Sequence, residues 1–318
     1  MAYKYNFGLK IWPDNKPSTM EQHMATSNYY VPESSYFPIV ASLGLIGMAA
    51  GAGGMMNHMS AGGEGFVFPH FVFTAGSLLL AFIFFQWFGK VITESRAGMY
   101  SPQMDKSFRW GMSWFIFSEV MFFVAFFGVL LYVRQWAGPW LDGQGDKGST
   151  HMLWPDFDYA WPMFNNPAGA DFPGPQAVID PWHIPLLNTV LLMTSSVTLT
   201  IAHHALRAMH RGKTIFWLAV TVILGGIFVY YQILEYIEAY TELGLTLDSG
   251  IYGSTFFMLT GFHGLHVTIG AFILFIMWIR ICKGHFTPDQ HFGFEAAAWY
   301  WHFVDMVWVG LFLFVYIL

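Results

Sequence analysis

The sequence predicts an all-α, polytopic membrane protein with seven transmembrane helices, and three observations support this fold class. Of its 318 residues, 55% are hydrophobic and only 11% are charged, whereas a soluble domain carries about 25% charged residues. Seven stretches contain the roughly 20 mostly apolar residues that a helix needs to cross the hydrocarbon core of a bilayer. Basic residues gather in every second loop, as they do in multi-span proteins.

The seven spans differ in composition. The first is rich in glycine, which permits close approach of a neighbouring helix, and the sixth is long enough to project beyond the bilayer. A single cysteine, Cys282, excludes a disulfide framework and a thiolate metal cluster within this chain. The predicted spans cover residues 37–56, 66–88, 110–133, 184–206, 215–236, 251–281 and 295–318.

The distribution of basic residues sets the predicted orientation. Twelve of the fourteen Lys and Arg residues precede the first span or lie in the loops after the second, fourth and sixth, and only Arg134 and Lys147 fall on the other side. Because basic residues stay cytoplasmic in short loops, the N-terminus is expected to be cytoplasmic and the C-terminus periplasmic. The predicted segments are a cytoplasmic N-terminal segment (1–36), spans one and two (37–92), a cytoplasmic loop with span three (93–134), a periplasmic loop (135–183) and spans four to seven (184–318).

The periplasmic loop is the one long polar segment between spans. It holds seven prolines and six acidic residues, and no hydrophobic pattern in it indicates a core of its own. We expect it to cover the outer face of the protein, ordered by packing on a neighbour.

Ionisable residues inside a membrane span are the main candidates for function. Glu119 lies about nine residues into the third span, and a carboxyl at that depth needs a partner or stays neutral. His263 and His266 stand three residues apart on the sixth span, so either is expected to hydrogen-bond Glu119. The residues leave two roles open for Glu119: a clamp within the bundle, or a carboxyl near a proton route.

A polar stripe follows the seventh span. Glu295, Trp299, His302 and Asp305 recur at spacings of four, three and three, so they share one helix face that must contact protein. His302 and Asp305 are expected to pair, with the carboxylate fixing the imidazole tautomer.

The spacing of the histidines predicts no metal site in this chain. His203 and His204 are adjacent on a helix and diverge by about 100°, so both cannot bind one ion, and no third ligand converges on His263 and His266. A haem held by His266 and His302 is an alternative that the spacing permits. No nucleotide-binding loop, nucleophile elbow or zinc-protease pattern is present, and nothing indicates nucleic-acid binding.

Several distinctive motifs lie on spans three, four, six and seven. They are SEV at 118–120, IPLLNT at 184–189, AHHA at 202–205, YGSTFF at 252–257, TGFHGLH at 260–266 and HFGFEAAAWYWHFVD at 291–305. In their sequence and order these motifs resemble subunit III of the haem–copper cytochrome c oxidases, of the bacterial aa3 type.

This resemblance implies a subunit of a proton-pumping oxidase in aerobic respiration and its electron transport chain. Subunit III has no redox centre of its own, and its spans form two groups, one to two and three to seven, around a cleft filled by phospholipids. The haems and copper lie in partner subunits. Subunits I and II and a small subunit are the expected partners, and a larger assembly with a cytochrome bc1 complex is left open. Subunit III is expected to support proton uptake and to protect subunit I from inactivation during turnover.

The resemblance also assigns residues. Glu119 corresponds to the family's membrane carboxyl, and lipid-phosphate contacts fall on Arg280, Lys283 and His285. Thr93 replaces a basic residue that many members carry after the second span, and Arg96 is expected to substitute for it. The motifs and the long outer loop look bacterial, which implies a multi-pass protein of the cell inner membrane. Quinol-oxidase relatives usually lack the first two spans, so the cytochrome c branch is favoured.

Two alternatives belong to other functional classes. The first is an autonomous proton-linked transporter that uses Glu119 and His266 as a relay, although the spans show no inverted repeat. The second is a small membrane cytochrome that binds haem through His266 and His302.

Overall fold

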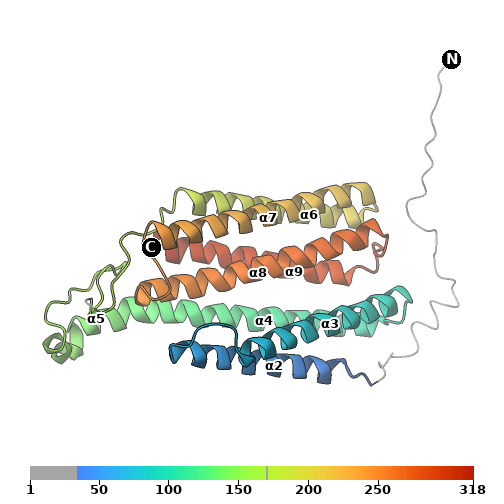
Figure 1. Ribbon diagram of the computed structural model, residues 1–318. Coiled ribbons are helices and arrows are strands. Elements are labelled where there is room, and N and C mark those ends of the chain that lie inside the picture. The colour runs from blue at the N-terminus through green and yellow to red at the C-terminus, as the bar shows by residue number, and fades with distance from the viewer. Residues whose placement is uncertain (1–33, 170) are drawn as a thin grey trace, which may run out of the picture. The chain divides into compact units, whose positions relative to one another are not determined.

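The computed structural model describes residues 34–169 and 171–318. Seven helices in these residues are long and apolar enough to cross a membrane, which confirms the predicted fold class. The predicted N-terminal segment, apart from residues 34–36, lies outside the described residues. The seven helices are α2 (Phe37–Ser60), α3 (Phe68–Arg96), α4 (Pro102–Tyr132), α6 (Ile184–Arg207), α7 (Arg211–Thr241), α8 (Ile251–Cys282) and α9 (Phe292–Leu311) (Figure 1).

Several helices extend beyond their predicted bounds. α4 begins at Pro102 rather than at 110, and its course continues through a π-helical turn, η1 (Val133–Ala137), and the short α5 (Gly138–Leu141). The predicted start of the outer loop at 135 is therefore too early. α9 likewise continues through a second π-helical turn, η3 (Phe312–Ile317). Hydropathy marks only the apolar part of a helix, whereas backbone hydrogen bonding carries the helix into its polar ends.

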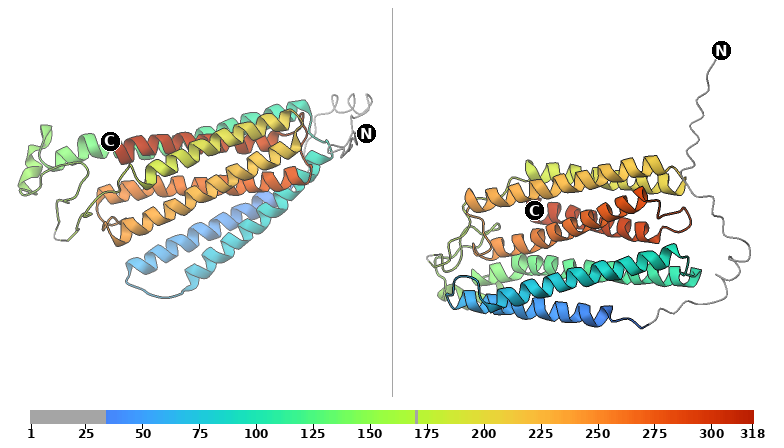
Figure 2. Two further views of the ribbon diagram at one scale, coloured as in Figure 1. Left: turned by 90° about the horizontal axis from the view of Figure 1, so that it is seen from above. Right: turned by 45° about the vertical axis from the view of Figure 1, so that its right-hand side comes forward.

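The described chain divides into two compact parts, residues 34–108 (the α2–α3 unit) and residues 109–318 (the main bundle). This division matches the expected grouping of spans, except that the first turns of α4 belong to the α2–α3 unit. Within that unit α2 and α3 run antiparallel (Figure 2). A Cβ atom on Gly76 would lie 2.8 Å from the Gly44 carbonyl oxygen and 2.7 Å from the Met48 nitrogen. The glycines of the first span therefore permit the close helix contact that their number predicted.

The main bundle is organised around buried tryptophans of α9. Trp301 and Trp308 are fully buried, and each indole N–H finds a hydroxyl on α6. Trp301 donates to Ser195 Oγ at 2.9 Å, and Trp308 donates to Thr189 Oγ1 at 2.9 Å. A buried indole costs free energy unless its N–H is hydrogen-bonded, so these two bonds fix the contact between α9 and α6.

α4 packs on this core through aromatic side chains. Phe122 of α4 makes an edge-to-face contact with Phe262 of α8, with ring centroids 5.0 Å apart. Phe123 lies 6.0 Å from Phe303 of α9, again between ring centroids. Rings of this size span a wide gap between helices and still fill it.

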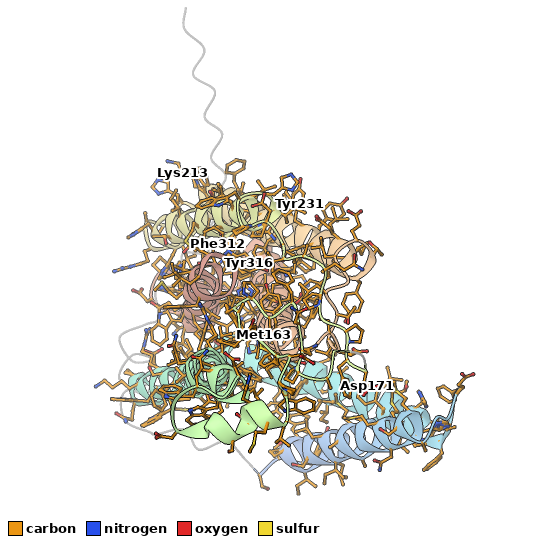
Figure 3. The ribbon with its side chains drawn as sticks, turned by 90° about the vertical axis from the view of Figure 1, so that its left-hand side faces the viewer. Met163, Asp171, Lys213, Tyr231, Phe312 and Tyr316 are labelled. Atoms are coloured by element: carbon orange, nitrogen blue, oxygen red, sulfur yellow. The ribbon has the colours of Figure 1, made fainter. Side chains whose placement is uncertain are left out.

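The outer loop, described at residues 142–169 and 171–183, packs on one end of the main bundle, which agrees with its predicted covering role. Phe157, Met163 and Ile179 are buried in the hydrophobic core of the bundle, and Figure 3 shows Met163 within the outline of the main bundle when it is viewed along the helices. Tyr159 donates a 2.8 Å hydrogen bond to the Arg134 carbonyl oxygen. Burial raises the pKa of the Tyr159 phenol, so the hydroxyl keeps its proton and remains a donor.

The two loops predicted to be cytoplasmic in the main bundle lie at one end of it. Arg211, at the start of α7, donates through Nε to the Ile281 carbonyl oxygen of α8 at 3.0 Å. The same carbonyl oxygen accepts from the Gly284 amide at 2.9 Å, so the guanidinium bond joins α7 to the turn that closes the end of α8. These two basic loops therefore share one end of the main bundle, and the side of the membrane remains a prediction.

Two glycines permit the packing of Trp301. A Cβ atom on Gly225 of α7 would lie 2.6 Å from Trp301 Cη2, and one on Gly270 of α8 would lie 2.9 Å from Trp301 Cε3. We expect Gly225→Ala to lower the free energy of unfolding by about 1–3 kcal/mol, because overpacking forces the ring or a helix to move. Thermal unfolding of the purified protein in mild detergent measures this change.

Gly226 supplies the matched control. It is the next residue on α7, and a Cβ atom there would meet nothing within 4 Å. Gly226→Ala is expected to leave the melting temperature unchanged or slightly raised. Equal melting of the two variants would contradict the assigned role of Gly225.

Candidate functional site

An acid–imidazole pair joins α4 to α8. His266 Nε2 lies 2.8 Å from Glu119 Oε2, the contact that the sequence predicted. The two side chains are 12% and 23% exposed in this chain. Aromatic rings surround the imidazole, and a low local dielectric strengthens a hydrogen bond. These rings belong to Phe122, Phe123, Tyr300 and Phe303.

The second ring nitrogen of His266 determines how many protons the pair holds. Nδ1 lies 2.6 Å from the Phe262 carbonyl oxygen, and a carbonyl oxygen only accepts hydrogen bonds. Nδ1 must therefore carry a hydrogen, and one further proton lies between Nε2 and the Glu119 carboxyl. The pair is either a neutral acid beside a neutral imidazole or a carboxylate beside an imidazolium, and the proton can pass between them without breaking the contact.

His263 does not take part in this pair. Its side chain is completely buried, and Nε2 lies 3.3 Å from the Val304 carbonyl oxygen of α9. The ring packs against Phe228 and Trp308. Of the two histidines proposed as partners for Glu119, the structure selects His266, because residues three apart on a helix differ in direction by about 60°.

The polar stripe on α9 serves two different contacts. His302 Nδ1 lies 2.7 Å from Ser196 Oγ of α6 and 3.5 Å from Asp305 Oδ2. The predicted proximity of His302 and Asp305 is present, but Ser196 is the closer partner of the ring. Trp299 is partly buried. Glu295 belongs to another cluster, one turn inside the start of α9.

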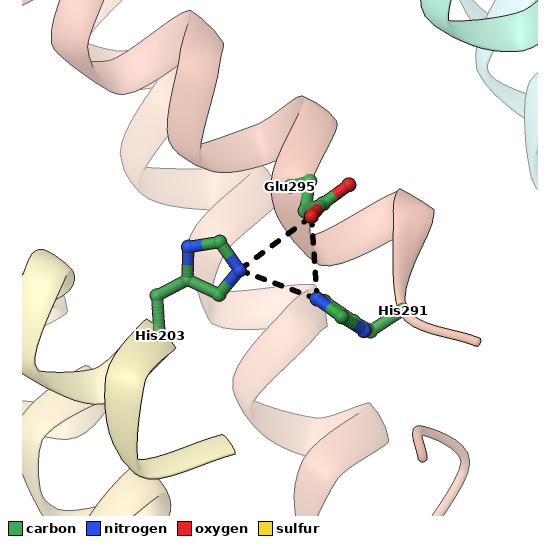
Figure 4. A group of neighbouring side chains, drawn as sticks. All are labelled: His203, His291 and Glu295. Atoms are coloured by element: carbon green, nitrogen blue, oxygen red, sulfur yellow. Dashed lines mark hydrogen bonds and ion pairs between the residues drawn. The ribbon is translucent and has the colours of Figure 1, made fainter. Parts of the chain in front are cut away.

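That cluster joins Arg109 of α4 to His203, His291 and Glu295, and Figure 4 shows the last three, from α6 and the start of α9. Glu295 Oε2 forms a 2.5 Å ion pair with Arg109 of α4. Glu295 Oε1 lies 3.3 Å from His291 Nε2 and 3.7 Å from His203 Nε2, and the two imidazole nitrogens are 3.3 Å apart. The sequence singled out Glu295 and His203 but joined neither to His291 or Arg109. The sequence offered one signal that could have joined them: all these residues are predicted to lie near the cytoplasmic face.

A buried carboxyl near the opposite end of the bundle also escaped the sequence interpretation. Glu235 of α7 is fully buried, and Tyr316 of η3 donates a 2.5 Å hydrogen bond to its Oε1. Glu235 stands near the end of a predicted span, where an acidic residue usually faces water. Only the packing of η3 shows that this one is enclosed.

The residues assigned to lipid contacts fall in two places. Arg280, Lys283 and His285 lie at the end of α8 and in the loop that follows. The Arg280 guanidinium lies 4.2 Å from the centre of the Phe286 ring, and the His285 amide donates to the Arg280 carbonyl oxygen at 3.0 Å. Lys283 is exposed. Arg96 is exposed at the end of α3, in the α2–α3 unit.

Both ring nitrogens of His266 have hydrogen-bond partners, which disfavours the alternative of a haem held by His266 and His302. A haem ligand needs a free ring nitrogen directed at the iron. Nδ1 is engaged by Phe262 and Nε2 by Glu119. His302 contacts Ser196 at one ring nitrogen.

The fold and these contacts define a class: a multi-pass helical membrane protein whose ionisable side chains pair across helices inside the bundle. The family model described as cytochrome c oxidase subunit III matches residues 27–134 and 160–318. The chain therefore belongs to the cytochrome c oxidase subunit III family, as its motifs predicted. The match leaves out residues 135–159, the first part of the long outer segment.

Curated relatives carry the same name. Cytochrome c oxidase subunit 3 of Oncorhynchus mykiss is 41% identical over 244 residues, covering 76% of this chain and 82% of that protein. The protein of the same name from Marchantia polymorpha is 38% identical over 289 residues, covering 91% and 95%. The one from Formosania lacustris is 37% identical over 289 residues, covering 91% and 96%.

We expect the Glu119–His266 pair to stabilise the main bundle. Glu119→Leu leaves Nε2 of His266 without its partner, which costs about 1–3 kcal/mol for a buried polar group. Glu119→Gln keeps a donor for that nitrogen and should cost less. Thermal unfolding in mild detergent compares the stability of the Leu and Gln variants. The double variant Glu119→Leu/His266→Leu measures the energetic coupling between the two side chains. A Leu variant as stable as the wild type would show that the pair is no clamp.

Proposed function

We propose that this chain is the non-redox subunit III of a proton-pumping cytochrome c oxidase in aerobic respiration. Membership of the family places it in an oxidase complex with other subunits. In the proposed role it packs against the catalytic subunit I, supports proton uptake there and binds phospholipids that stabilise the complex. Subunit II and a small subunit complete the complex, and the haems and redox copper lie in the partner subunits.

The observation that carries this proposal is the 2.8 Å contact between His266 Nε2 and Glu119 Oε2. Glu119 lies about 26 Å along α4 from Pro102, and His266 about 22 Å along α8 from Ile251, at 1.5 Å per residue. Both positions are deep in their helices, where an ionisable side chain is costly unless it is paired. A carboxyl that can change charge there without losing its hydrogen bond can respond to proton transfer in a neighbouring subunit.

We also place the complex in a bacterial inner membrane, on the form of the motifs and the long outer segment. The seven membrane helices support a multi-pass protein. An assembly with a cytochrome bc1 complex is a further prediction, which co-purification in mild detergent tests. No described contact favours the autonomous transporter.

Glu119→Gln tests the proton role in the intact oxidase complex. The amide keeps the contact with His266 but cannot share a proton, so assembly should be unchanged while oxygen consumption and proton release in vesicles fall. The loss should stay below the ~10²-fold that removal of a direct acid–base catalyst causes, because oxygen chemistry takes place in another subunit. Glu242→Gln, an exposed acid at the end of α7, controls for the change in net charge. If Glu119→Gln keeps the wild-type rates and turnover lifetime, the proton role is contradicted and the pair serves only as a clamp between helices.

Arg280→Ala tests the lipid role, which we assign to Arg280, Lys283, His285 and Arg96. A basic residue near an anionic lipid surface contributes about 1 kcal/mol, so anionic phospholipid should dissociate about fivefold more readily. The complex should also inactivate faster during turnover. Mass spectrometry of bound lipid and the turnover lifetime measure the two effects.

Two variants serve as controls for the lipid experiment. Arg280→Lys keeps the charge and changes the contact with Phe286, and Lys213→Ala removes an exposed cation from the first turn of α7. Both should retain lipid. Equal lipid content and lifetime in Arg280→Ala and the wild type would refute the assignment.

A further inference from the structure

We propose that His203, His291 and Glu295 bind a zinc ion at the end of the main bundle that is predicted to be cytoplasmic. The three side chains come from near the end of α6 and from the start of α9, and Figure 4 shows them directed at a common point. One ligand atom from each lies within 4.8 Å of the other two. The site goes beyond the proposed role in proton uptake and lipid binding.

The distances between the ligand atoms match tetrahedral coordination. Zinc binds imidazole nitrogen and carboxylate oxygen at about 2.0–2.1 Å in a tetrahedron, which separates neighbouring ligand atoms by about 3.3 Å. The observed separations are 3.3 Å between the two imidazole nitrogens, 3.3 Å from His291 to Glu295, and 3.7 Å from His203 to Glu295. A square-planar arrangement at the same bond lengths would instead need about 2.9 Å between adjacent ligands, so the geometry favours zinc over copper(II).

The ligand types point to the same ion. Calcium and magnesium take oxygen ligands, whereas two imidazoles and one carboxylate form a set that zinc enzymes use, with the fourth position open to water. His203 and Glu295 are 27% and 15% exposed at the side chain, and His291 is 9% exposed. These fractions leave a path for an ion and its water while the helices hold the ligands in place.

Hydrogen bonds alone satisfy the cluster poorly. Two imidazole nitrogens and one carboxylate oxygen converge and make three contacts with one another. A neutral imidazole carries only one N–H. While both histidines are neutral, these three contacts therefore cannot all be hydrogen bonds from an N–H to an acceptor. A cation at their centre makes all three contacts favourable. Arg109 binds Glu295 through Oε2, which leaves Oε1 as the coordinating atom and orients the carboxylate, as outer-shell partners do in metal sites.

The test counts zinc in the intact membrane complex that contains this chain. The complex is stripped with a chelator, dialysed against Zn²⁺, and analysed for zinc by mass spectrometry and by X-ray absorption at the zinc edge. We expect His203→Gln to bind one zinc fewer per complex than the wild type. Its affinity should fall by more than the ~10–100-fold that loss of an outer-shell partner causes.

His204→Gln is the matched control, since His204 is the adjacent histidine, is exposed, and is no part of the cluster. It should keep the zinc, and so should His203→Cys, because a thiolate replaces imidazole as a zinc ligand. His291→Gln, on α9, should lose the same ion and gives a second test if His203→Gln fails to assemble.

The absorption spectrum should show a shell of nitrogen and oxygen neighbours at about 2.0–2.1 Å with imidazole scattering, and this shell should be missing in His203→Gln. Equal zinc in the wild type, His203→Gln and His291→Gln would overturn the proposal. A wild-type complex that binds no such zinc, or that takes up only copper in competition, would overturn it as well.

Discussion

The burial of the Trp301 indole is the interaction on which the packing of the main bundle depends. Its ring, carried by α9, lies against glycines of α7 and α8, and its N–H reaches Ser195 of α6. Four helices therefore meet at one side chain. Lipid tails are as apolar as the side chains they touch, so close packing and satisfied polar groups hold membrane helices together where hydrophobicity cannot.

The other polar side chains within the bundle follow the same rule. Inside a bilayer an unpaired polar group costs several kcal/mol, and several of these groups find a partner on a different helix. Each such pair fixes the rotation of two helices about their axes, so the polar residues specify the arrangement more than the many Phe and Leu residues do. The pairs include Thr198 with Thr221, Tyr236 with Thr260, Ser196 with His302, and Glu235 with Tyr316.

The ionisable groups differ with depth along the helices. Glu119 and His266, in the middle, form a 2.8 Å pair within an aromatic surrounding. Nearer the end, Glu295 is held by the Arg109 guanidinium at one oxygen and faces two histidines with the other. One bundle therefore provides two different environments for a carboxyl group: a single imidazole partner in the middle, and an arginine with two imidazoles nearer the end.

The sequence by itself determined the helical class, the seven spans and the family, because hydropathy, charge alternation and motifs are properties of the linear chain. It also joined Glu119 to the sixth span, since a buried acid requires a partner and few candidates were available. Only the tertiary structure showed that His266, rather than His263, contacts Glu119. It also showed that His302 contacts Ser196, and that His291 lies beside His203 and Glu295. These choices depend on the rotation of each helix about its axis and on contacts between distant segments. Helical periodicity gives the face that a side chain occupies but not the helix that the face meets.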